Sequence, residues 1–288
     1  MKYEAKVIPE GINTSKHNPI RELLLLGTAS LAVIFVIILL LTFLTDYLVS
    51  FIPPEVESRW FDNSLINFES AEMDPSGQEK FLQGEQYLLS LIRELKQDQY
   101  QDFEFTINII DAEQPNAFII PGGHIFITSA LFNYIDSENG LAMVLSHEMA
   151  HQYRRHPLRA MGRGVIIGVA LSALFGSDTG DWIQDLLFEA VNISQLAFSR
   201  EQEREADSIA VQSLIKHYGH AQGATEFFIK IRAVKEFQNS IPTFYQSHPG
   251  TEERIEFIAQ YENQQNGLKK GLPDFIMKIT QRSEASKD

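Results

Sequence analysis

The chain has 288 residues and no cysteine, and its 24 Lys and Arg against 38 Asp and Glu give a formal net charge of −14. This length allows one sizeable domain with extensions, or two modest domains. The acidic balance argues against a nucleic-acid partner, because phosphate binding depends on cationic side chains. Without cysteine there is no disulfide and no thiolate metal site, so any bound metal must be held by His, Asp or Glu.

Residues 23–45 form an uncharged, apolar run that is long enough for a helix to cross the hydrocarbon core of a bilayer. A cleaved signal peptide is the less favoured interpretation, because its apolar core usually has only about 7–15 residues. Between Asp46 and Gln78 the only cationic residue is Arg59, whereas four precede the run: Lys2, Lys6, Lys16 and Arg21.

The positive-inside tendency turns this charge difference into a topology. It predicts a cytoplasmic tail (1–22), a single transmembrane anchor in contact with membrane lipid (23–45), and a main domain outside the cytoplasm. The expected location is the bacterial inner membrane with the domain in the periplasm, or in the equivalent outer compartment.

The segment after the anchor is predicted to be a linker (46–75), because SFIPPEVESRW reads as an extended connection with two prolines. From about residue 76 the apolar residues form a helical stripe, and FEFTINII (103–110) alternates as a strand does. Two apolar, β-rich runs flank residues 121–123, which indicates two strands joined by a turn. The globular part therefore begins with a helix and a small sheet.

A second helix is predicted from Ser137, a favourable N-cap, to Arg155, with Pro157 as the stop. The apolar run GVIIGVALSALF (164–175) is too short to span a bilayer. A buried helix is the favoured interpretation of this run, and a lid or membrane-dipping segment is the alternative. A polar tail is predicted for residues 263–288.

The stretch HEMAHQYRRH (147–156) carries the strongest chemical signal. On a helix, His147 and His151 share one face, and Glu148 lies beside them. Zinc hydrolysis needs this layout: two imidazoles hold the metal, an open position holds water, and the carboxylate takes the proton of that water as it attacks a carbonyl. The alternative is a polar face with solvated histidines, which the apolar LAMVLS before it disfavours.

His156 is a poor candidate for the third ligand. The metzincin arrangement needs Gly at position 154 and His at position 157, where this chain has Arg154 and Pro157. We therefore interpret His156 as a helix-end residue near the carbonyl dipoles.

A better candidate lies in FSREQEREADSIAVQSL, where Glu203 and Asp207 are four residues apart. The small residues Ala206 and Ala210 on the same face would let this helix pack closely on another. Glu203 could then reach the metal, and Asp207 could accept a hydrogen bond from a ligand histidine. The alternative is a solvated charged face, which is the usual meaning of a run such as REQERE.

HEMAH, SREQEREAD, NAFIIPGG and SHPGTEERI together resemble the M48 family of zinc metallopeptidases, which includes HtpX-like, Ste24-like and Oma1-like membrane proteases. The resemblance covers about residues 78–259. It implies an α+β fold, in which a mainly helical gluzincin-type domain with a small β-sheet covers residues 76–262. It also implies that this domain binds one Zn²⁺ per chain through His147, His151 and Glu203, and that Asp207 supports these ligands from behind. Unlike the multi-spanning members, this chain shows one convincing span.

The NAFII segment is predicted to be an edge strand, in which Asn116, Ala117 and Phe118 pair with an extended peptide substrate; the resemblance supports this. His124, in the following strand, is interpreted as a surface or core histidine rather than a ligand.

The resemblance also places His248, in SHPGTEERI, near the metal. It could donate to the oxyanion of the reaction. It could instead bind zinc as a latch until substrate or a partner displaces the loop. The third interpretation is a solvated loop histidine, and the latch is slightly favoured.

Two functions are weighed. The first is a membrane-anchored zinc endopeptidase for protein quality control, which hydrolyses unfolded or damaged envelope polypeptides through Glu148-assisted attack of zinc-bound water. The second is a non-catalytic membrane chaperone or adaptor with the same fold. The intact set His147, Glu148, His151 and Glu203 favours the protease, because a scaffold has no use for a base beside an open metal position.

Overall fold

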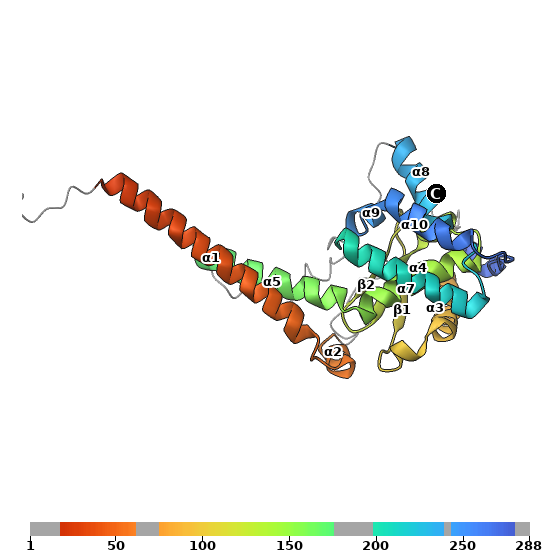
Figure 1. Ribbon diagram of the computed structural model, residues 1–288. Coiled ribbons are helices and arrows are strands. Elements are labelled where there is room, and N and C mark those ends of the chain that lie inside the picture. The colour runs from red at the N-terminus through yellow and green to blue at the C-terminus, as the bar shows by residue number, and fades with distance from the viewer. Residues whose placement is uncertain (1–17, 62–74, 176–197, 239–242, 280–288) are drawn as a thin grey trace, which may run out of the picture.

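The computed structural model describes residues 18–61, 75–175, 198–238 and 243–279. A helical stalk projects from a mainly helical body (Figure 1). The stalk contains α1 (Pro19–Val49), which includes the predicted anchor and is, among the described helices, the one long and apolar enough to cross a membrane. Of the predicted tail (1–22), residues 1–17 lie outside the described residues, and residues 19–22 form the first turn of α1.

The linker prediction is wrong for residues 54–60, which form the helix α2 (Pro54–Trp60). Pro54 occupies the first helical position, where a missing N–H costs nothing, and Glu55 and Glu57 in the first turn suit the positive end of the helix dipole. The two prolines therefore start a helix rather than maintain an extended chain.

The body begins with α3 (Pro75–Leu95) and a three-stranded sheet of order β1-β3-β2, as expected from the helical and alternating patterns. β1 (Thr106–Ile110) pairs in parallel with β3 (His124–Thr128), and β2 (Ala117–Ile120) pairs with β3 in antiparallel register. Gly122 and Gly123 form the predicted turn with φ of 93° and 87°, a conformation that suits glycine.

Helix α4 (Glu138–Tyr153) runs through the centre of the body and is buried along nearly its whole length. It packs against β2, α3 and above all α7 (Arg200–Tyr218). The remaining described elements surround this pair: the 3-10 turns Asp98–Tyr100 and Ser129–Tyr134, α8 (Glu226–Gln238), α9 (Thr243–Ser247), α10 (Thr251–Glu262) and α11 (Asp274–Met277).

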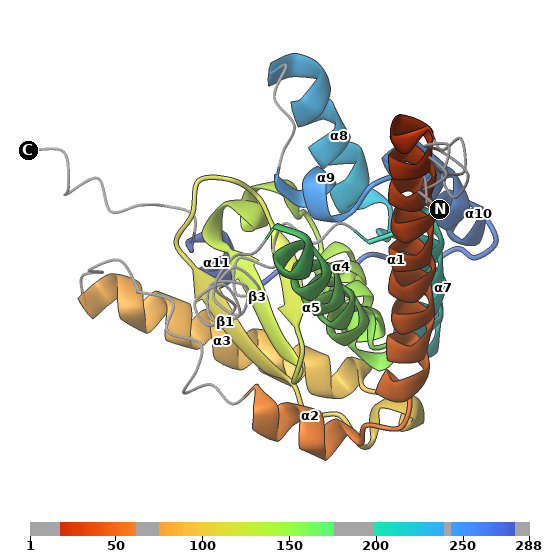
Figure 2. The ribbon, with the colours of Figure 1, turned by 90° about the vertical axis from the view of Figure 1, so that its left-hand side faces the viewer.

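Two predicted segments behave differently in the structure. Residues 263–279, expected in the polar tail, dock on the body: Ile276 is fully buried, and the Lys270 carbonyl accepts a hydrogen bond from Glu138 N at the start of α4. The run 164–175 belongs to α5 (His156–Phe175), which lies beside α1 in the stalk (Figure 2). The interpretation as a buried helix is wrong for the residues whose burial is described: positions 164–166 and 168 are only partly buried, and Val169 is 48% exposed.

Candidate metal centre

The helix that carries HEMAH has defined ends. Ser137 caps its start by accepting a hydrogen bond from Gly140 N at 3.1 Å, as predicted. Its end is set by Arg155, whose φ of 58° is left-handed, rather than by Pro157, which lies in the first turn of α5. Only two residues separate α4 from α5.

The facing helix α7 is capped by Ser199, whose side chain and that of Gln202 form a capping box. Glu203 and Asp207 follow on the face toward α4, and both are fully buried. Ala206 and Ala210 are also fully buried, so small residues let the two helices approach closely as the sequence predicts.

The structure brings His147, His151, Glu203 and His248 into one buried group whose candidate ligand atoms lie within 4.8 Å of one another. His147 Nε2 lies 3.0 Å from His151 Nε2 and 3.3 Å from His248 Nδ1. Glu203 Oε2 lies 3.4 Å from His147 Nε2, and its Oε1 lies 3.4 Å from His151 Nε2 and 3.1 Å from His248 Nδ1.

This group fits one zinc ion. Zinc–nitrogen and zinc–oxygen bonds of about 2.0–2.1 Å in a tetrahedron place neighbouring ligand atoms roughly 3.3 Å apart. Five of the six pairs in the group have separations of 3.0–3.4 Å, which agree with that spacing, and all four candidate atoms lie within 4.8 Å of one another. Three imidazoles and a carboxylate are also a donor set that suits zinc.

Glu148 lies beside the group without belonging to it. Its carboxylate is fully buried and, among the described residues, neither oxygen has a hydrogen-bond partner. His248 lies close to it, with Nε2 at 3.7 Å from Oε1. Burial raises the pKa of Glu148, and the nearby His248 and His147 oppose that rise. A carboxyl group with a raised pKa holds a proton more readily, as a general base must.

Asp207 contacts His147 and not His151, which resolves the two options that the sequence leaves open. Its Oδ1 lies 3.0 Å from His147 Nδ1, so the opposite nitrogen faces the candidate metal position. A carboxylate in this place fixes the orientation and tautomer of a ligand histidine.

Arg254, in the first turn of α10, is a site residue that sequence reasoning missed. It binds Asp207 through two hydrogen bonds, from Nε at 2.7 Å and from an Nη at 2.8 Å, and its other Nη lies 2.6 Å from Glu203. Its guanidinium also stacks over Phe228 at 4.6 Å from the ring centroid. The available signal was its position four residues before the buried Ile258, on the inner face of α10.

The electrostatics keep both carboxylates ionised. Burial alone raises the pKa of Glu203 and Asp207, but Arg254, with further help from neighbouring histidines, lowers both overall, that of Glu203 well below its usual range. Burial lowers the pKa of His151, so this imidazole is neutral, as a metal ligand must be.

His147 shifts the other way. Burial and Arg254 lower its pKa, but hydrogen bonds to Asp207 and Glu203 raise it to about 9 overall. Metal and proton therefore compete for this residue.

The interpretation of His156 as a helix-end residue near carbonyl dipoles is wrong, because α4 ends at Tyr153 and His156 is the first residue of α5. His156 is 1% exposed, its Nδ1 lies 2.9 Å from His151 Nδ1, and its Nε2 lies 3.3 Å from Glu205. His156 is thus placed behind His151 as Asp207 is behind His147. Glu205, expected to be solvated, is about one third exposed and also pairs with Arg154.

His248 follows α9 and is fully buried, so its interpretation as a solvated loop histidine is wrong. Its ring stacks on Phe244 with the centroids 4.5 Å apart. Its Nδ1 is in the ligand group while its Nε2 points toward Glu148.

The predicted edge strand is β2, which stands at one end of the strand order and packs on α4. Asn116, Ala117 and Phe118 are all buried, and the Asn116 carbonyl accepts a hydrogen bond from Thr128 N at 2.9 Å. His124 is a core histidine as expected, with Nδ1 2.8 Å from Thr106 Oγ1.

A second buried arginine cluster, which the sequence did not predict, lies at the carboxyl end of α4, next to the metal centre. Glu57 of α2 is fully buried and accepts hydrogen bonds from Gly122 N at 3.0 Å and Gln152 Nε2 at 2.9 Å. Arg155 completes the cluster by an ion pair with Glu57 and a hydrogen bond to the Ile52 carbonyl. The segment just after the anchor is therefore joined to the end of the HEMAH helix.

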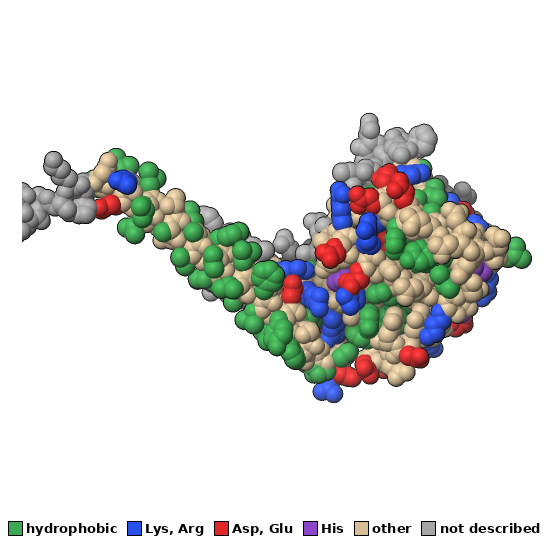
Figure 3. Space-filling model, in the orientation of Figure 1, with side chains coloured by type: hydrophobic (Ala, Val, Ile, Leu, Met, Phe, Trp, Pro, Cys, Tyr) green, Lys and Arg blue, Asp and Glu red, His purple; other side chains and the backbone are tan. Residues whose placement is uncertain are grey.

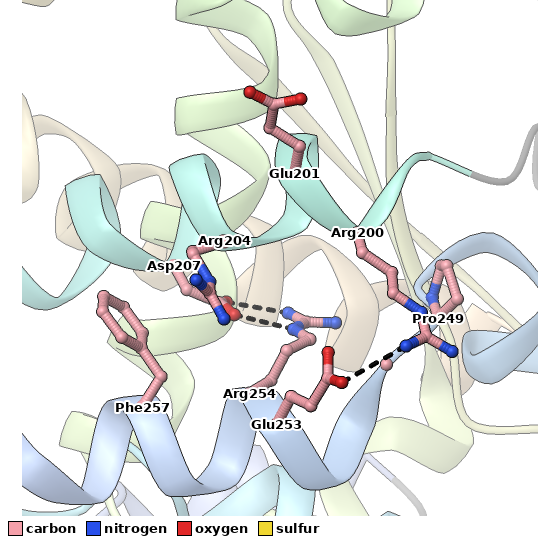
Figure 4. Close-up of a pocket in the computed structure, with 9 residues that line it drawn as sticks. Arg200, Glu201, Arg204, Asp207, Pro249, Glu253, Arg254 and Phe257 are labelled. Carbon is pink, nitrogen blue, oxygen red and sulfur yellow. Dashed lines mark hydrogen bonds and ion pairs between the residues drawn. The ribbon is translucent and has the colours of Figure 1, made fainter.

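A hollow of about 420 Å³ lies between the first turns of α7 and α10 (Figure 4). Its walls include Asp207 and Arg254, joined by their two hydrogen bonds, and Arg200, paired with Glu253. None of the four candidate ligands lines it. It is therefore on the outer side of the Asp207–Arg254 pair, and we do not assign it to substrate.

The comparisons with known proteins agree with this geometry. A model of peptidase family M48 matches residues 79–262. The chain is 30% identical over 162 residues to the mitochondrial metalloendopeptidase OMA1 of Schizosaccharomyces pombe, covering 56% of this chain and 47% of the relative. It is 28% identical over 169 residues to the beta-barrel assembly-enhancing protease of Escherichia coli, covering 56% of this chain and 35% of the relative. The chain thus spans less than half the length of these relatives.

Proposed function

We propose that this chain, which belongs to peptidase family M48, is a membrane-anchored zinc endopeptidase that cleaves unfolded or damaged proteins of the bacterial envelope. The observation that carries the proposal is Glu148, a buried carboxylate with no hydrogen-bond partner among the described residues, next to a group that fits zinc. A buried carboxylate without a hydrogen bond destabilises a fold, so its presence calls for a functional reason.

His147, His151 and Glu203 would hold the metal, with Asp207 and Arg254 fixing His147 and Glu203 from behind. Zinc bound there would polarise a peptide carbonyl and acidify water. Glu148 accepts the proton of the attacking water and then passes it to the leaving amine, a role that its raised pKa favours.

β2 is the proposed platform for the substrate. An extended peptide would add a strand beside Asn116, Ala117 and Phe118, so that backbone hydrogen bonds position the scissile carbonyl. Recognition through the backbone needs an extended chain, and folded proteins rarely offer one. This supports unfolded or damaged polypeptides as the substrate class. The names of the relatives, a metalloendopeptidase and an assembly-enhancing protease, are compatible with it.

His248 is proposed to be a latch. Its Nδ1 is the fourth donor of the group, so a zinc ion held by all four would have no open position for water. Burial of β2 likewise leaves no room for a substrate strand without movement. Displacement of His248 would open the site. The oxyanion role remains the alternative, because Nε2 faces Glu148 and could donate to a substrate oxygen after such a movement.

The decisive test compares full-length wild type, Glu148→Gln and the exposed control Glu79→Gln for cleavage of an unfolded model protein and for bound zinc. Glu148→Gln should retain one zinc and lose cleavage by at least about 10²-fold, because only the base is removed. Glu79→Gln should match wild type. Equal cleavage by Glu148→Gln and wild type would refute the peptidase mechanism, and no cleavage by either would favour the adaptor.

His248→Ala separates the two roles of that histidine. A rise in cleavage at unchanged zinc content supports the latch. A fall of about 10²–10³-fold with zinc retained supports the oxyanion role, and activity within about twofold of wild type contradicts both.

The orientation of the anchor follows from Lys2, Lys6, Lys16 and Arg21 before the span against Arg59 after it. We propose a cytoplasmic amino terminus and a periplasmic peptidase domain. An alkaline phosphatase fused after Asp288 should be active in cells, and an active cytoplasmic reporter at the same position would reverse the assignment.

A further inference from the structure

The helix α5 presents apolar surface outside the body. It carries no charge from Gly164 to Phe175, and Val169 on it is 48% exposed. Each Å² of apolar surface left in water costs about 25 cal/mol, and soluble proteins seldom leave contiguous apolar patches exposed without an interaction partner. The question is what covers this face.

α5 and α1 pack side by side and run in opposite directions, since α1 enters the body at its carboxyl end and α5 leaves the body there (Figures 1 and 2). Gly162 fixes their contact, because a Cβ at this position would come within 2.5 Å of Thr45 Cγ2. At the next position Arg163 pairs with Asp46 at 3.5 Å. The two helices therefore contact each other at the point where the uncharged run of each helix meets charged residues.

Asp46 is the first charged residue after the uncharged run of α1, and Arg163 is the last charged residue before the uncharged run of α5. The uncharged runs of both helices therefore start at the same height on the stalk, and both extend away from the body. Figure 3 shows hydrophobic side chains along the stalk and Lys and Arg side chains gathered where it joins the body. Arg159 lies one turn nearer the body than Arg163, and both, with Asp46, line a hollow of about 860 Å³ at this junction.

We propose that α5 enters the bilayer beside α1, with lipid acyl chains covering its exposed face and Arg163 at the level of the headgroups. The inference rests on α1 being the membrane anchor of the proposed function. Arginine suits this boundary, because its stem can lie against apolar surface while the guanidinium reaches polar headgroups. At 1.5 Å per residue, residues 164–175 reach about 18 Å into a hydrocarbon core of about 30 Å.

The placement has a consequence for the metal centre. His156, the first residue of α5, touches His151 at 2.9 Å. The helix from His156 to Arg163 is about 10 Å long, so the metal centre lies on the order of 10–15 Å from the headgroups. Substrate segments close to the membrane surface are then the ones the site reaches most easily.

The absence of cysteine in the chain makes the test direct, since single cysteines can be introduced without removing others. Full-length Val169→Cys and Val165→Cys carry a nitroxide spin label in phosphatidylcholine–phosphatidylglycerol vesicles. Power saturation with oxygen and with a water-soluble nickel chelate then reports the depth of each label. Leu40→Cys in α1 is the membrane control, and Leu268→Cys, whose side chain is 93% exposed on the body, is the aqueous control.

The Val169 label should resemble the Leu40 label, with high oxygen and low nickel accessibility, and should lie about 6 Å deeper than the Val165 label. A Val169 label as accessible to nickel as the Leu268 label would overturn the inference. Equal depth at both α5 positions, meaning a helix lying on the surface, contradicts it too, as does shielding from both reagents, meaning a protein cover. An aqueous Leu40 label would refute the anchor itself, an outcome distinct from failure of α5 alone.

Discussion

Two buried arginine–carboxylate clusters hold the HEMAH helix, and they differ in what they join. At the metal centre, Arg254 binds Asp207 and Glu203, which orient or provide candidate ligands. Just past the carboxyl end of α4, Arg155 binds Glu57, which comes from the short helix after the anchor. The first cluster joins parts of the peptidase domain to one another, whereas the second joins that domain to its membrane connection. Similar chemistry therefore serves metal binding in one place and attachment in the other.

The largest expected effect is that of Arg254→Met. It leaves two buried carboxylates without their cation, which typically costs about 3–5 kcal/mol, and it frees Glu203 and Asp207 from their fixed positions. Thermal unfolding of the full-length protein in detergent should shift down by roughly 10 °C or more, and zinc content should fall. Arg200→Met, which removes an arginine that is 71% exposed, is the control and should change neither. Normal zinc affinity in Arg254→Met would show that the cluster is structural only.

Glu57→Gln should give a smaller effect confined to stability. The amide still accepts a hydrogen bond, but Arg155 loses its buried counter-charge, so we expect a loss of about 1.5–3 kcal/mol and a Tm lower by several degrees. Zinc content should stay at the wild-type level. Glu55→Gln, an exposed change on the same helix, is the matched control. Loss of zinc in Glu57→Gln would mean that the attachment also supports the metal centre, and the distinction between the clusters would then fail.

The smallest effect is expected at Glu138, a buried carboxylate at the start of α4 that is held without an arginine. Burial raises its pKa, but hydrogen bonds from Lys270, Tyr87 and Tyr218 lower it overall. A carboxyl group with a lowered folded-state pKa stabilises the fold at neutral pH, and this contribution is lost as the pH falls through that pKa. The Tm difference between wild type and Glu138→Gln should therefore shrink from pH 7 toward pH 4. A difference that is constant with pH would contradict this.

Much of the fold and of the ligand group could be predicted because the signals are local. The four-residue spacing of His147 and His151, the N-cap at Ser137 and the small residues of α7 each act within a few turns of helix. Such patterns do not depend on which distant segments meet.

The contacts that were missed depend on tertiary approach. Glu57 reaches Gln152 across 95 positions, in a segment whose two prolines suggested an extended linker. Arg254 meets Asp207 across 47 positions from within an acidic run, where a solvated face is the usual expectation. The metzincin spacing shows only whether His156 could be a metal ligand, and it does not predict that His156 lies beside His151. The role of each of these residues depends on the distant residue that it contacts, and the local sequence does not identify that residue.

The chain position of Arg254 also sets an order of events during synthesis. The anchor is made first, the HEMAH helix follows, and the guanidinium that fixes Asp207 and Glu203 is added only after both of them. A nascent chain that has exposed α4 and α7 but not yet α10 therefore holds two unneutralised acids at its centre and lacks His248 as well. The site can therefore be complete only once the segment 248–254 has been synthesised, because it carries both His248 and Arg254.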